Sequence, residues 1–421
     1  MGVARLRSSG PRTRSLLQSS QLAIWSVLRH RRRTAFVVAA IAFGVAALIA
    51  SGSFIEWIFW ATREGTIQSG LGHIHVAKQG FQENGAMDPT AYLMTGNSPL
   101  LRELRDTPGV KTVSPRLYFS GLVSHGDTTI SFLGEGFDPD SEKKAGNVSI
   151  IVKGKDLSSA APSGVVMGNG LASNLGVTVG DKVALLVNVP GGGINGVDAV
   201  VRGLFATVSK AYDDSAIRAP LPLAHQLLRN SGVHEWIIFL DHTADTRQAL
   251  QAFRKRFSGS GLEFVPWYEL ADFYNKTVKL LSRQMDVVEL IIGLIIVITI
   301  SNSMMMAVME RVSEIGTAMA LGTRKRGVLL QFILEGLFLG IFGGALGVAV
   351  GIGIAELVST IGIPMPPAPG QARGYRAGMI VTATIVETAC AIAVLTALIA
   401  AIYPAWKASR TNIVDALRHN R

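Results

Sequence analysis

Four long apolar runs are the feature that most constrains this chain. The first run holds no charged residue between Thr34 and Glu56. An α-helix rises about 1.5 Å per residue and the hydrocarbon core of a bilayer is about 30 Å thick, so roughly 20 apolar residues cross it. A buried helix of a soluble protein would explain one such run, but not four. We therefore predict four membrane spans, along Thr34–Trp60, Val287–Met309, Val328–Ile361 and Met379–Ile402.

The first run differs from a secretory signal peptide. Its apolar stretch is longer than the hydrophobic region of such a peptide, and 33 residues precede it. We interpret the run as an uncleaved anchor. Residues 17–28 just before it are amphipathic and predict a short helix lying in the membrane interface, with Trp25 at headgroup depth.

Basic residues near the spans indicate the orientation of the chain. Residues 1–60 contain eight Arg and one acidic residue, whereas residues 61–285 are almost neutral, with 22 Lys and Arg against 21 Asp and Glu. Basic residues next to spans mark the cytoplasmic side. Both termini and the loop after the second span are therefore predicted to be cytoplasmic, and residues 61–285 to lie on the outer side of the membrane. The Arg-rich N-terminal tail adjoins a span and lacks interleaved aromatic residues, so we expect no nucleic-acid partner.

The predicted fold is an α-helical membrane protein with four transmembrane helices and a large mixed α/β domain inserted between the first two. Strand and helix patterns alternate in residues 61–285, and polar helical stretches at Glu56–Gln68 and Pro266–Arg283 predict two stalks. The only cysteine, Cys390, lies in the fourth span, so the domain contains no disulfide. The predicted segments are 1–33 (tail and interfacial helix), 34–60 (span), 61–285 (domain with stalks), 286–309 (span), 310–327 (cytoplasmic helix and turn), 328–361 (span), 362–378 (outer loop), 379–402 (span) and 403–421 (cytoplasmic tail).

No catalytic motif is present in the sequence. It lacks a G-x-x-x-x-G-K-[ST] phosphate loop, a G-x-S-x-G and an H-E-x-x-H. His73 and His75 would share one face of a strand as metal ligands can, but ordinary strand surface is the favoured interpretation. The pair Asp213 and Asp214 is interpreted as part of a turn. We therefore expect a non-catalytic membrane subunit with no metal and no cofactor bound to this chain.

Polar residues within the predicted spans are a second group of candidates. A carboxylate in hydrocarbon costs a few kcal/mol and usually faces a bundle interior or marks a pathway. Asn302, Glu335 and Glu387 are such candidates, for helix contact or conformational coupling, whereas Glu289 and Glu356 lie close to span ends. A proton relay is disfavoured because the spans offer no His, Lys or Arg to pair with these groups.

The third span is rich in glycine at a four-residue spacing. Such a face lets another helix approach closely, either within one chain or across a dimer. Both alternatives stay open from the sequence. The candidate packing residues are Gly336, Gly340, Gly344 and Gly347.

The segment after the second span predicts a short amphipathic helix on the cytoplasmic face, ended by a glycine and followed by a basic turn. Its sequence from residue 310 is ERVSEIGTAMALGTRKRG. The candidate residues for contact with an energy-supplying partner are Glu310, Arg311, Glu314, Ile315, Gly316, Leu321 and Gly322.

This segment resembles the E-R-x-x-E-I-G-x-x-x-A-x-G signature of FtsX-like ABC transporter permeases. The C-terminal YPAWKASRTNIVDALR, residues 403–418, is similar to the closing motif of that family, and LAIWSVLRHRRRTAF resembles its opening. The resemblance implies that the segment is a coupling helix docking on a separate ABC-type ATPase dimer, which holds ATP and Mg²⁺. It also implies a multi-pass protein of a bacterial inner membrane with residues 61–285 in the periplasm, and a second permease copy or paralogue. ATP-driven motion is then expected to be relayed through the stalks, a mechanotransmission mechanism.

Within that family the chain is most similar to the lipoprotein-releasing permeases. SGLGHIHVAKQGF (69–81) and GNGLASNLGVTVGDKVAL (168–185) carry this resemblance, which implies extraction of lipoprotein or lipid at the periplasmic face. In those permeases a loop after the central strands holds a soluble carrier. Here NVPGGGINGVDA (188–199) takes that place without a basic residue. The candidate residues for a carrier or adaptor are Val189, Pro190, Gly191, Gly192 and Gly193.

Two other functions stay open from the sequence. One is macrolide- or peptide-type efflux through a periplasmic adaptor, and the other is FtsX-like regulation of a cell-wall hydrolase. The cargo, the ATPase and the choice between a homodimer and a heterodimer are not determined by these motifs.

Overall fold

The computed structural model describes residues 31–85, 87–96, 98–146, 150–189, 192–207, 210–365 and 375–410. The chain divides into two compact units. The helical unit comprises residues 1–59, 278–363 and 376–421, and the globular unit comprises residues 60–277 and 364–375. The predicted interfacial helix at 17–28 and the chain after Arg410 lie outside the described residues.

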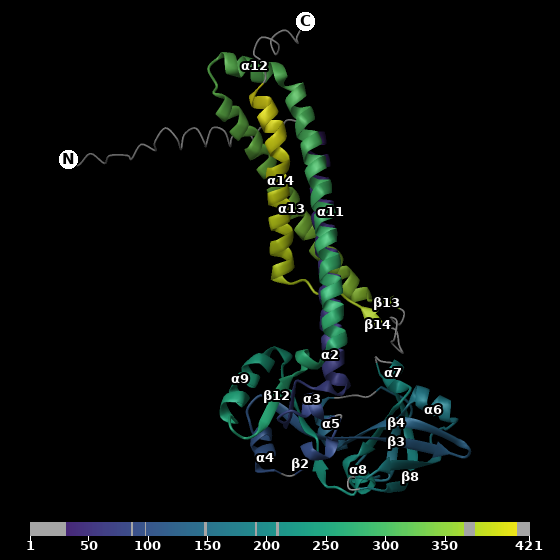
Figure 1. Ribbon diagram of the computed structural model, residues 1–421. Helices are drawn as coiled ribbons and strands as arrows, with labels where there is room; N and C mark the ends of the chain where they lie inside the picture. Colours follow the sequence, from purple (N-terminus) through teal and green to yellow (C-terminus); the bar gives the residue numbers. More distant parts are fainter. Residues whose placement is uncertain are drawn as a thin grey trace, which may run out of the picture. The chain divides into compact units, whose positions relative to one another are not determined.

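Within the described part of the chain, four helices are long and apolar enough to cross a membrane (Figure 1). A backbone in hydrocarbon must satisfy its own hydrogen bonds, and an uninterrupted apolar run does so as a helix. α14 begins four residues after the predicted span start at Met379, because the Thr382 side chain accepts a hydrogen bond from the Ile385 backbone N–H and caps the helix. The four helices are α2 (Arg31–Thr66), α11 (Asp272–Glu310), α13 (Lys325–Ile361) and α14 (Ala383–Ser409).

The core of the helical unit contains buried residues of all four long helices, and α13 and α14 pack side by side within it (Figure 1). Alanine recurs every fourth residue of α14 and is buried at each of these positions, so one face of the helix is narrow. This face lies against the glycine-rich face of α13. The buried alanines are Ala389, Ala393, Ala397, Ala401 and Ala405.

The globular unit contains one ten-stranded sheet among the described residues. β3 (Val110–His125) is its longest strand and belongs to two parts of the sheet. Its first half pairs with β11 (Glu235–Leu240), and its second half pairs with β4 (Thr128–Phe137) and β7 (Lys182–Asn188). Beyond β11 the sheet continues through β1 (Ile74–Lys78) to the edge strand β12 (Leu262–Pro266).

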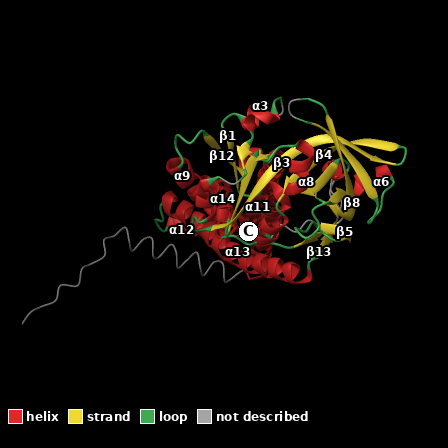
Figure 2. Ribbon diagram, turned by 90° about the horizontal axis from the view of Figure 1, so that it is seen from below, coloured by secondary structure: helices red, strands yellow, loops and turns green. Residues whose placement is uncertain are grey.

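Six of these strands close a ring within the described residues, in the order β3, β4, β9, β6, β8 and β7, which returns to β3. Figure 2 shows two of them, β3 and β4, side by side. Closure pairs the strand edges that would otherwise be left open. The interior holds a compact apolar core with Leu117, Val165 and Ile217 among its buried members. The remaining strands are β5 (Ile150–Gly154), β6 (Gly164–Gly168), β8 (Ile194–Ala206) and β9 (Ala216–Pro220).

Short helices cover the sheet or connect its strands. Two of them begin at a side-chain cap: α4 at Ser98 and α5 at Asp138, whose carboxylate accepts from the backbone N–H of Ser141. They are α3 (Phe81–Asn84), α4 (Pro99–Arg105), α5 (Pro139–Ala145), α6 (Asn169–Leu175), α7 (Lys210–Asp213), α8 (Leu221–Leu228), α9 (Thr246–Arg256) and α10 (Trp267–Leu270).

Irregular helices and small sheets complete the described structure. A π-helix, η1 (Ile67–Leu71), follows α2 directly and ends at Gly72, whose φ of 64° is in the left-handed region. The 3-10 helices are η2 (Pro89–Tyr92) and η3 (Thr243–Asp245). Two strand pairs lie outside the main sheet, β2 (Met94–Thr95) with β10 (Gly232–Val233) and β13 (Ile363–Met365) with β14 (Tyr375–Ala377).

Candidate functional site

The short helix α12 (Val312–Ala320) joins α11 to α13 (Figure 1). The helical path breaks at Arg311, which has φ −112° and ψ 16°. Ile315, Gly316 and Met319 are buried, whereas Glu314 is exposed. Because residues three to four apart share a helix face, this pattern gives α12 one face inside the helical unit and one face open to a partner.

An exposed apolar and basic turn follows α12. The Leu321 side chain is 85% exposed, and Gly322 turns the chain with a φ of +102° that favours glycine. The next three basic residues are all exposed and precede or begin α13. The open surface of this segment therefore combines an acidic residue, a large apolar side chain and a basic cluster. The basic residues are Arg324, Lys325 and Arg326.

Glu335 has a basic neighbour that the sequence interpretation missed. The Nη1 atom of Arg311 lies 4.0 Å from Oε2 of Glu335 on α13, and the two side chains are only 12% and 7% exposed. The sequence suggested that no cation was available to this carboxylate, because Arg311 was assigned to the cytoplasmic segment alone. The contact instead connects the break before α12 to the third span.

Asn302 and Glu387 do not join Glu335 inside the helical unit. Both are exposed on the surface of the chain, Asn302 on α11 and Glu387 on α14. The structure therefore separates the three polar candidates. Only Glu335 lies in the interior, with Gly336 and Leu339 buried beside it on α13.

The candidate glycines of α13 contact other helices of the same chain. A Cβ atom at Gly336 or Gly340 would lie 2.6 Å from an alanine Cβ of α14, and one at Gly344 would lie 3.4 Å from the next alanine. A Cβ at Gly347 would lie 2.6 Å from the Cβ of Val45 on α2. One row of glycines therefore brings α14 close to α13, and a second row, which includes Gly343, Gly347 and Gly351, brings α2 close within the same chain.

The candidate partner loop is the tip of a β-hairpin. Residues 188 and 194–199 of the predicted loop belong to β7 and β8, which pair across it. The Val189 backbone N–H donates to the Gly193 carbonyl, and the Gly192 N–H donates to the Val189 carbonyl. Pro190 and Gly191 lie outside the described residues.

A buried ionic cluster lies where β3 passes from one part of the sheet to the other. Arg116 is 1% exposed and donates from Nη1 to Glu135 at 2.7 Å and from Nη2 to Glu142 at 2.6 Å. Its guanidinium group lies 4.6 Å from the ring centroid of Phe137. Burial alone would lower the pKa of Arg116, but the carboxylates of Glu135 and Glu142 raise it above its usual value. Arg116 is therefore held as a cation.

The same cluster extends to β9. Nε of the buried Arg218 lies 3.4 Å from the carboxylate of Glu135, and the guanidinium group lies 4.7 Å from the ring centroid of Phe205. The Tyr212 hydroxyl donates to Glu135 at 3.1 Å. Burial, together with the Glu135 charge, raises the pKa of Tyr212 to about 12, so the hydroxyl keeps its proton. One carboxylate thus accepts hydrogen bonds from Arg116 and Tyr212 and forms an ion pair with Arg218, so it contacts three different elements.

On the other side of β3, Glu235 is the centre of a second polar group. His75 Nδ1 lies 2.8 Å from its carboxylate, and the Tyr118 hydroxyl donates to it. Burial alone would raise the pKa of Glu235, but His75, Tyr118 and Arg116 together lower it below its usual value. The two groups are adjacent along β3, so buried polar side chains cross five neighbouring strands: β1, β11, β3, β4 and β9.

His73 and His75 are buried, at 6% and 4% exposure, so their interpretation as strand surface was wrong. β1 lies between β11 and β12, and both histidines are inside the fold. They bind different partners: His73 Nδ1 accepts from the Leu240 backbone N–H, whereas His75 contacts Glu235. Among the described residues, no group of three or more His, Cys, Asp or Glu could hold a metal ion.

Asp213 and Asp214 likewise have separate partners. Asp213 is buried and accepts from the backbone N–H and the hydroxyl of Thr207, whereas Asp214 pairs with Lys210 at 3.0 Å on the surface. Burial raises the pKa of Asp213 despite these hydrogen bonds. The pair fixes the approach to α7 and does not form a shared acid site.

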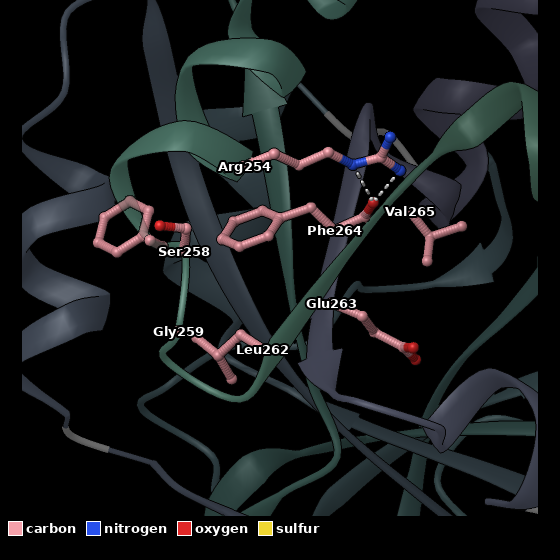
Figure 3. Close-up of a pocket in the computed structure, with 8 residues that line it drawn as sticks. Arg254, Ser258, Gly259, Leu262, Glu263, Phe264 and Val265 are labelled. Carbon is pink, nitrogen blue, oxygen red and sulfur yellow. Dashed lines mark hydrogen bonds between the residues drawn. The ribbon is translucent and has the colours of Figure 1, made fainter.

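A shallow pocket of about 300 Å³ lies at the edge strand β12 (Figure 3). Its two charged side chains, Arg254 and Glu263, already have partners. Arg254 donates from Nε and Nη2 to the Phe264 carbonyl, and the Glu263 carboxylate accepts from the backbone N–H groups of Gly80 and Gln82. Arg254 thereby covers a carbonyl of the exposed sheet edge, which is a way to prevent strand addition.

We expect His73 to make the globular unit sensitive to acid. Burial lowers its pKa from 6.5 to about 4; Glu64 partly opposes this and Lys111 adds to it. Between these pH values the unfolded chain therefore binds more protons than the folded chain. The free energy of unfolding falls as pH decreases from 6.5 to 4. The loss reaches about 3 kcal/mol at about 1.4 kcal/mol per pH unit, and above pH 6.5 the effect is absent.

The pH effect can be measured as the unfolding midpoint of the full chain in detergent, followed from pH 7.5 to 4. Burial also lowers the pKa values of His225 and His234, so both add a loss in the same direction. His73→Gln should be less steep than wild type across this range. Identical slopes for wild type and His73→Gln would show that His73 titrates normally.

Two family profiles match separate parts of the chain. The MacB-like periplasmic core domain matches residues 34–256, and the FtsX-like permease C-terminal domain matches residues 287–413. The first covers more than half of the chain and includes α2 and most of the globular unit. The second covers the other three long helices, with α12 between them.

Curated relatives show the same similarity. The macrolide export ATP-binding/permease protein MacB of Brucella abortus is 40% identical over 136 residues, which are 32% of this chain and 18% of that protein. The pyoverdine export ATP-binding/permease protein PvdT of Pseudomonas putida is 26% identical over 436 residues, which are 96% of this chain and 60% of that protein. The chain therefore corresponds to only part of each relative.

Among solved structures, the periplasmic region of MacB from Actinobacillus actinomycetemcomitans aligns with a TM-score of 0.35 at 11% identity, covering 50% of this chain and 96% of that one. The match of the core domain profile to residues 34–256 places the mixed α/β domain in the periplasm, between the first and second long helices. This multi-pass membrane chain belongs to the family of FtsX-like, MacB-type ABC permeases.

Proposed function

We propose that this chain is the permease subunit of an ATP-driven exporter, and that α12 is its contact with the ATPase. The observation that carries the proposal is the two-faced structure of α12, with Ile315 and Met319 anchored in the helical unit and Glu314 and Leu321 exposed. A short helix held in this way moves with the spans to which it is anchored. A partner bound to its open face therefore drives the spans directly.

Topology supports a cytoplasmic location for α12. The periplasmic domain lies between the first and second spans, so the segment between the second and third spans emerges on the opposite side of the membrane. The exposed basic turn at residues 324–326 agrees with this side, because basic residues near spans favour the cytoplasm. We propose that ATP and Mg²⁺ bind to a separate ABC-type ATPase dimer at this surface, beneath two permease copies.

For the cargo, we propose efflux of a small molecule or peptide through a periplasmic adaptor. The relatives reported above are named for macrolide and pyoverdine export, so they favour this alternative over the lipoprotein function that the sequence motifs suggested. The tip of the β7–β8 hairpin, which includes Gly192 and Gly193, is the proposed adaptor contact. It lies at the end of the strand ring and has an exposed apolar neighbour in Ile194.

The coupling role of α12 is tested by the partner's ATPase activity in the assembled complex. We expect Leu321→Glu and Glu314→Lys to reduce stimulation at least about tenfold, because a central interface contact contributes roughly 2 kcal/mol. Gly316→Pro should abolish stimulation, since proline breaks a helix interior. Met87→Glu is the matched control, because Met87 is similarly exposed, at 86%, but belongs to the globular unit. Normal stimulation in all three α12 variants would contradict the assignment.

A further inference from the structure

His73 lies at a point where several segments of the globular unit meet. Its backbone N–H donates to the Ile238 carbonyl of β11, and its backbone carbonyl accepts from the N–H of Trp267, at 2.9 and 3.0 Å. Trp267 begins α10, which leads directly into α11. The His73 main chain therefore connects the sheet to the start of the second stalk.

The His73 ring makes the connection to the first stalk. Nδ1 accepts a hydrogen bond from the Leu240 backbone N–H at 3.1 Å, so this nitrogen carries no proton. The neutral ring then has its proton on Nε2, which lies 3.1 Å from the Thr243 hydroxyl oxygen. Since Nε2 donates to that oxygen, the Thr243 proton is directed to the Glu64 carboxylate, 3.2 Å away. Glu64 is in the last turns of α2.

These contacts form a chain of hydrogen bonds with one direction, from Leu240 through His73 and Thr243 to Glu64. The low pKa of His73 keeps its ring neutral above about pH 4, as this pattern requires. Apolar contacts join the two stalks at the same position. Ile67, the residue directly after α2, is 1% exposed and packs with Trp267 and Ala271.

We propose that His73 is the joint that fixes both stalks to the sheet, through its main chain to Trp267 and through the Thr243 hydroxyl to Glu64. This inference rests on the proposed function, in which the stalks carry ATP-driven motion. His73, Thr243 and Glu64 are then positioning residues for that motion. A stalk released from the sheet would move without displacing the strand ring.

Hydrogen exchange of the full chain in lipid nanodiscs tests the joint. Thr243→Val keeps the shape of the side chain but ends the hydrogen-bond chain. We expect exchange in peptides covering residues 60–71 to rise about fivefold, the change that corresponds to one lost hydrogen bond of about 1 kcal/mol. Peptides covering β4 serve as the internal control and should not change. Glu64→Ala should have the same effect as Thr243→Val.

Conservative variants separate the joint from a general packing role. Thr243→Ser restores the hydroxyl, and Glu64→Gln keeps an acceptor oxygen without the charge, so both should exchange within about twofold of wild type. Exchange in residues 60–71 should also rise in His73→Gln, because a flexible amide that donates to Thr243 does not hold its oxygen at the Nδ1 position that accepts from Leu240. Wild-type exchange in Thr243→Val and Glu64→Ala, or equal increases in Thr243→Val and Thr243→Ser, would overturn the proposal. These measurements use no ATPase, so a failure of the export function is recognised separately, by the absence of an ATPase partner for wild type.

Discussion

Arg116→Met should destabilise the periplasmic domain by about 3–5 kcal/mol, the usual cost of leaving a buried charge without its partner. The substitution keeps most of the side-chain volume but removes both donors to Glu135 and Glu142. The two carboxylates then remain in the fold with less compensation. The total stability of a domain is commonly about 5–15 kcal/mol, so the substitution should remove a large part of it and lower the amount of the protein in cells.

A second arginine of the same domain provides the control for Arg116. Arg256 contacts Glu103 at 2.6 Å, the same distance as between Arg116 and Glu142. The Arg256 side chain, however, is 53% exposed and that of Glu103 is 41% exposed. Exposed pairs contribute only about 0–1 kcal/mol, so Arg256→Met should change the midpoint of unfolding little. Denaturant unfolding of both variants in detergent measures the difference. Equal effects would show that burial of the Arg116 cluster has no energetic consequence.

Gly347→Leu should disrupt the helical unit. A Cβ atom at this position would lie 2.6 Å from the Cβ of Val45 and 2.7 Å from the backbone oxygen of Ala42, both on α2. Backbone atoms are not easily displaced, so α2 and α13 must separate. Overpacking of this kind typically costs about 1–3 kcal/mol, and separation of two spans adds lost packing. We expect a lower melting temperature in detergent and reduced insertion into the membrane.

Gly353→Leu is the matched control on the same helix. A Cβ at Gly353 would meet no atom within 4 Å in the described structure, so the larger side chain has space. Its melting temperature should remain close to that of wild type. If both leucine variants have the same lowered melting temperature, the decrease would reflect a general intolerance of α13 to leucine rather than the contact with α2.

The long helices could be predicted from the sequence because hydropathy and length act locally. Each apolar run carries its own signal, and the α12 break is also local, with Gly322 after it. The cap at Thr382 shows the limit of this approach, since the apolar run begins at Met379 but the helix begins at Ala383. Composition identifies a span better than it identifies the residue at which a helix starts.

Contacts between distant residues could not be predicted in this way. His73 and His75 alternate with apolar residues as a surface strand does, but β1 is enclosed by β11 and β12, which follow it by about 160 and 190 residues. The pairing of Arg311 with Glu335 depends on how α11, α12 and α13 turn back on one another. Closure of the strand ring needs the parallel pairs β4–β9 and β6–β8, for which the sequence has no local signal.

Co-purification tests the central claim most directly. The tagged full chain is isolated in mild detergent, and its bound proteins are identified by mass spectrometry, in parallel with Leu321→Glu and the Met87→Glu control. The proposed function predicts an ABC-type ATPase with wild type and with Met87→Glu, and a strongly reduced amount with Leu321→Glu. Wild type without any ATPase, or equal amounts with all three proteins, would contradict the assignment of α12 as the coupling surface.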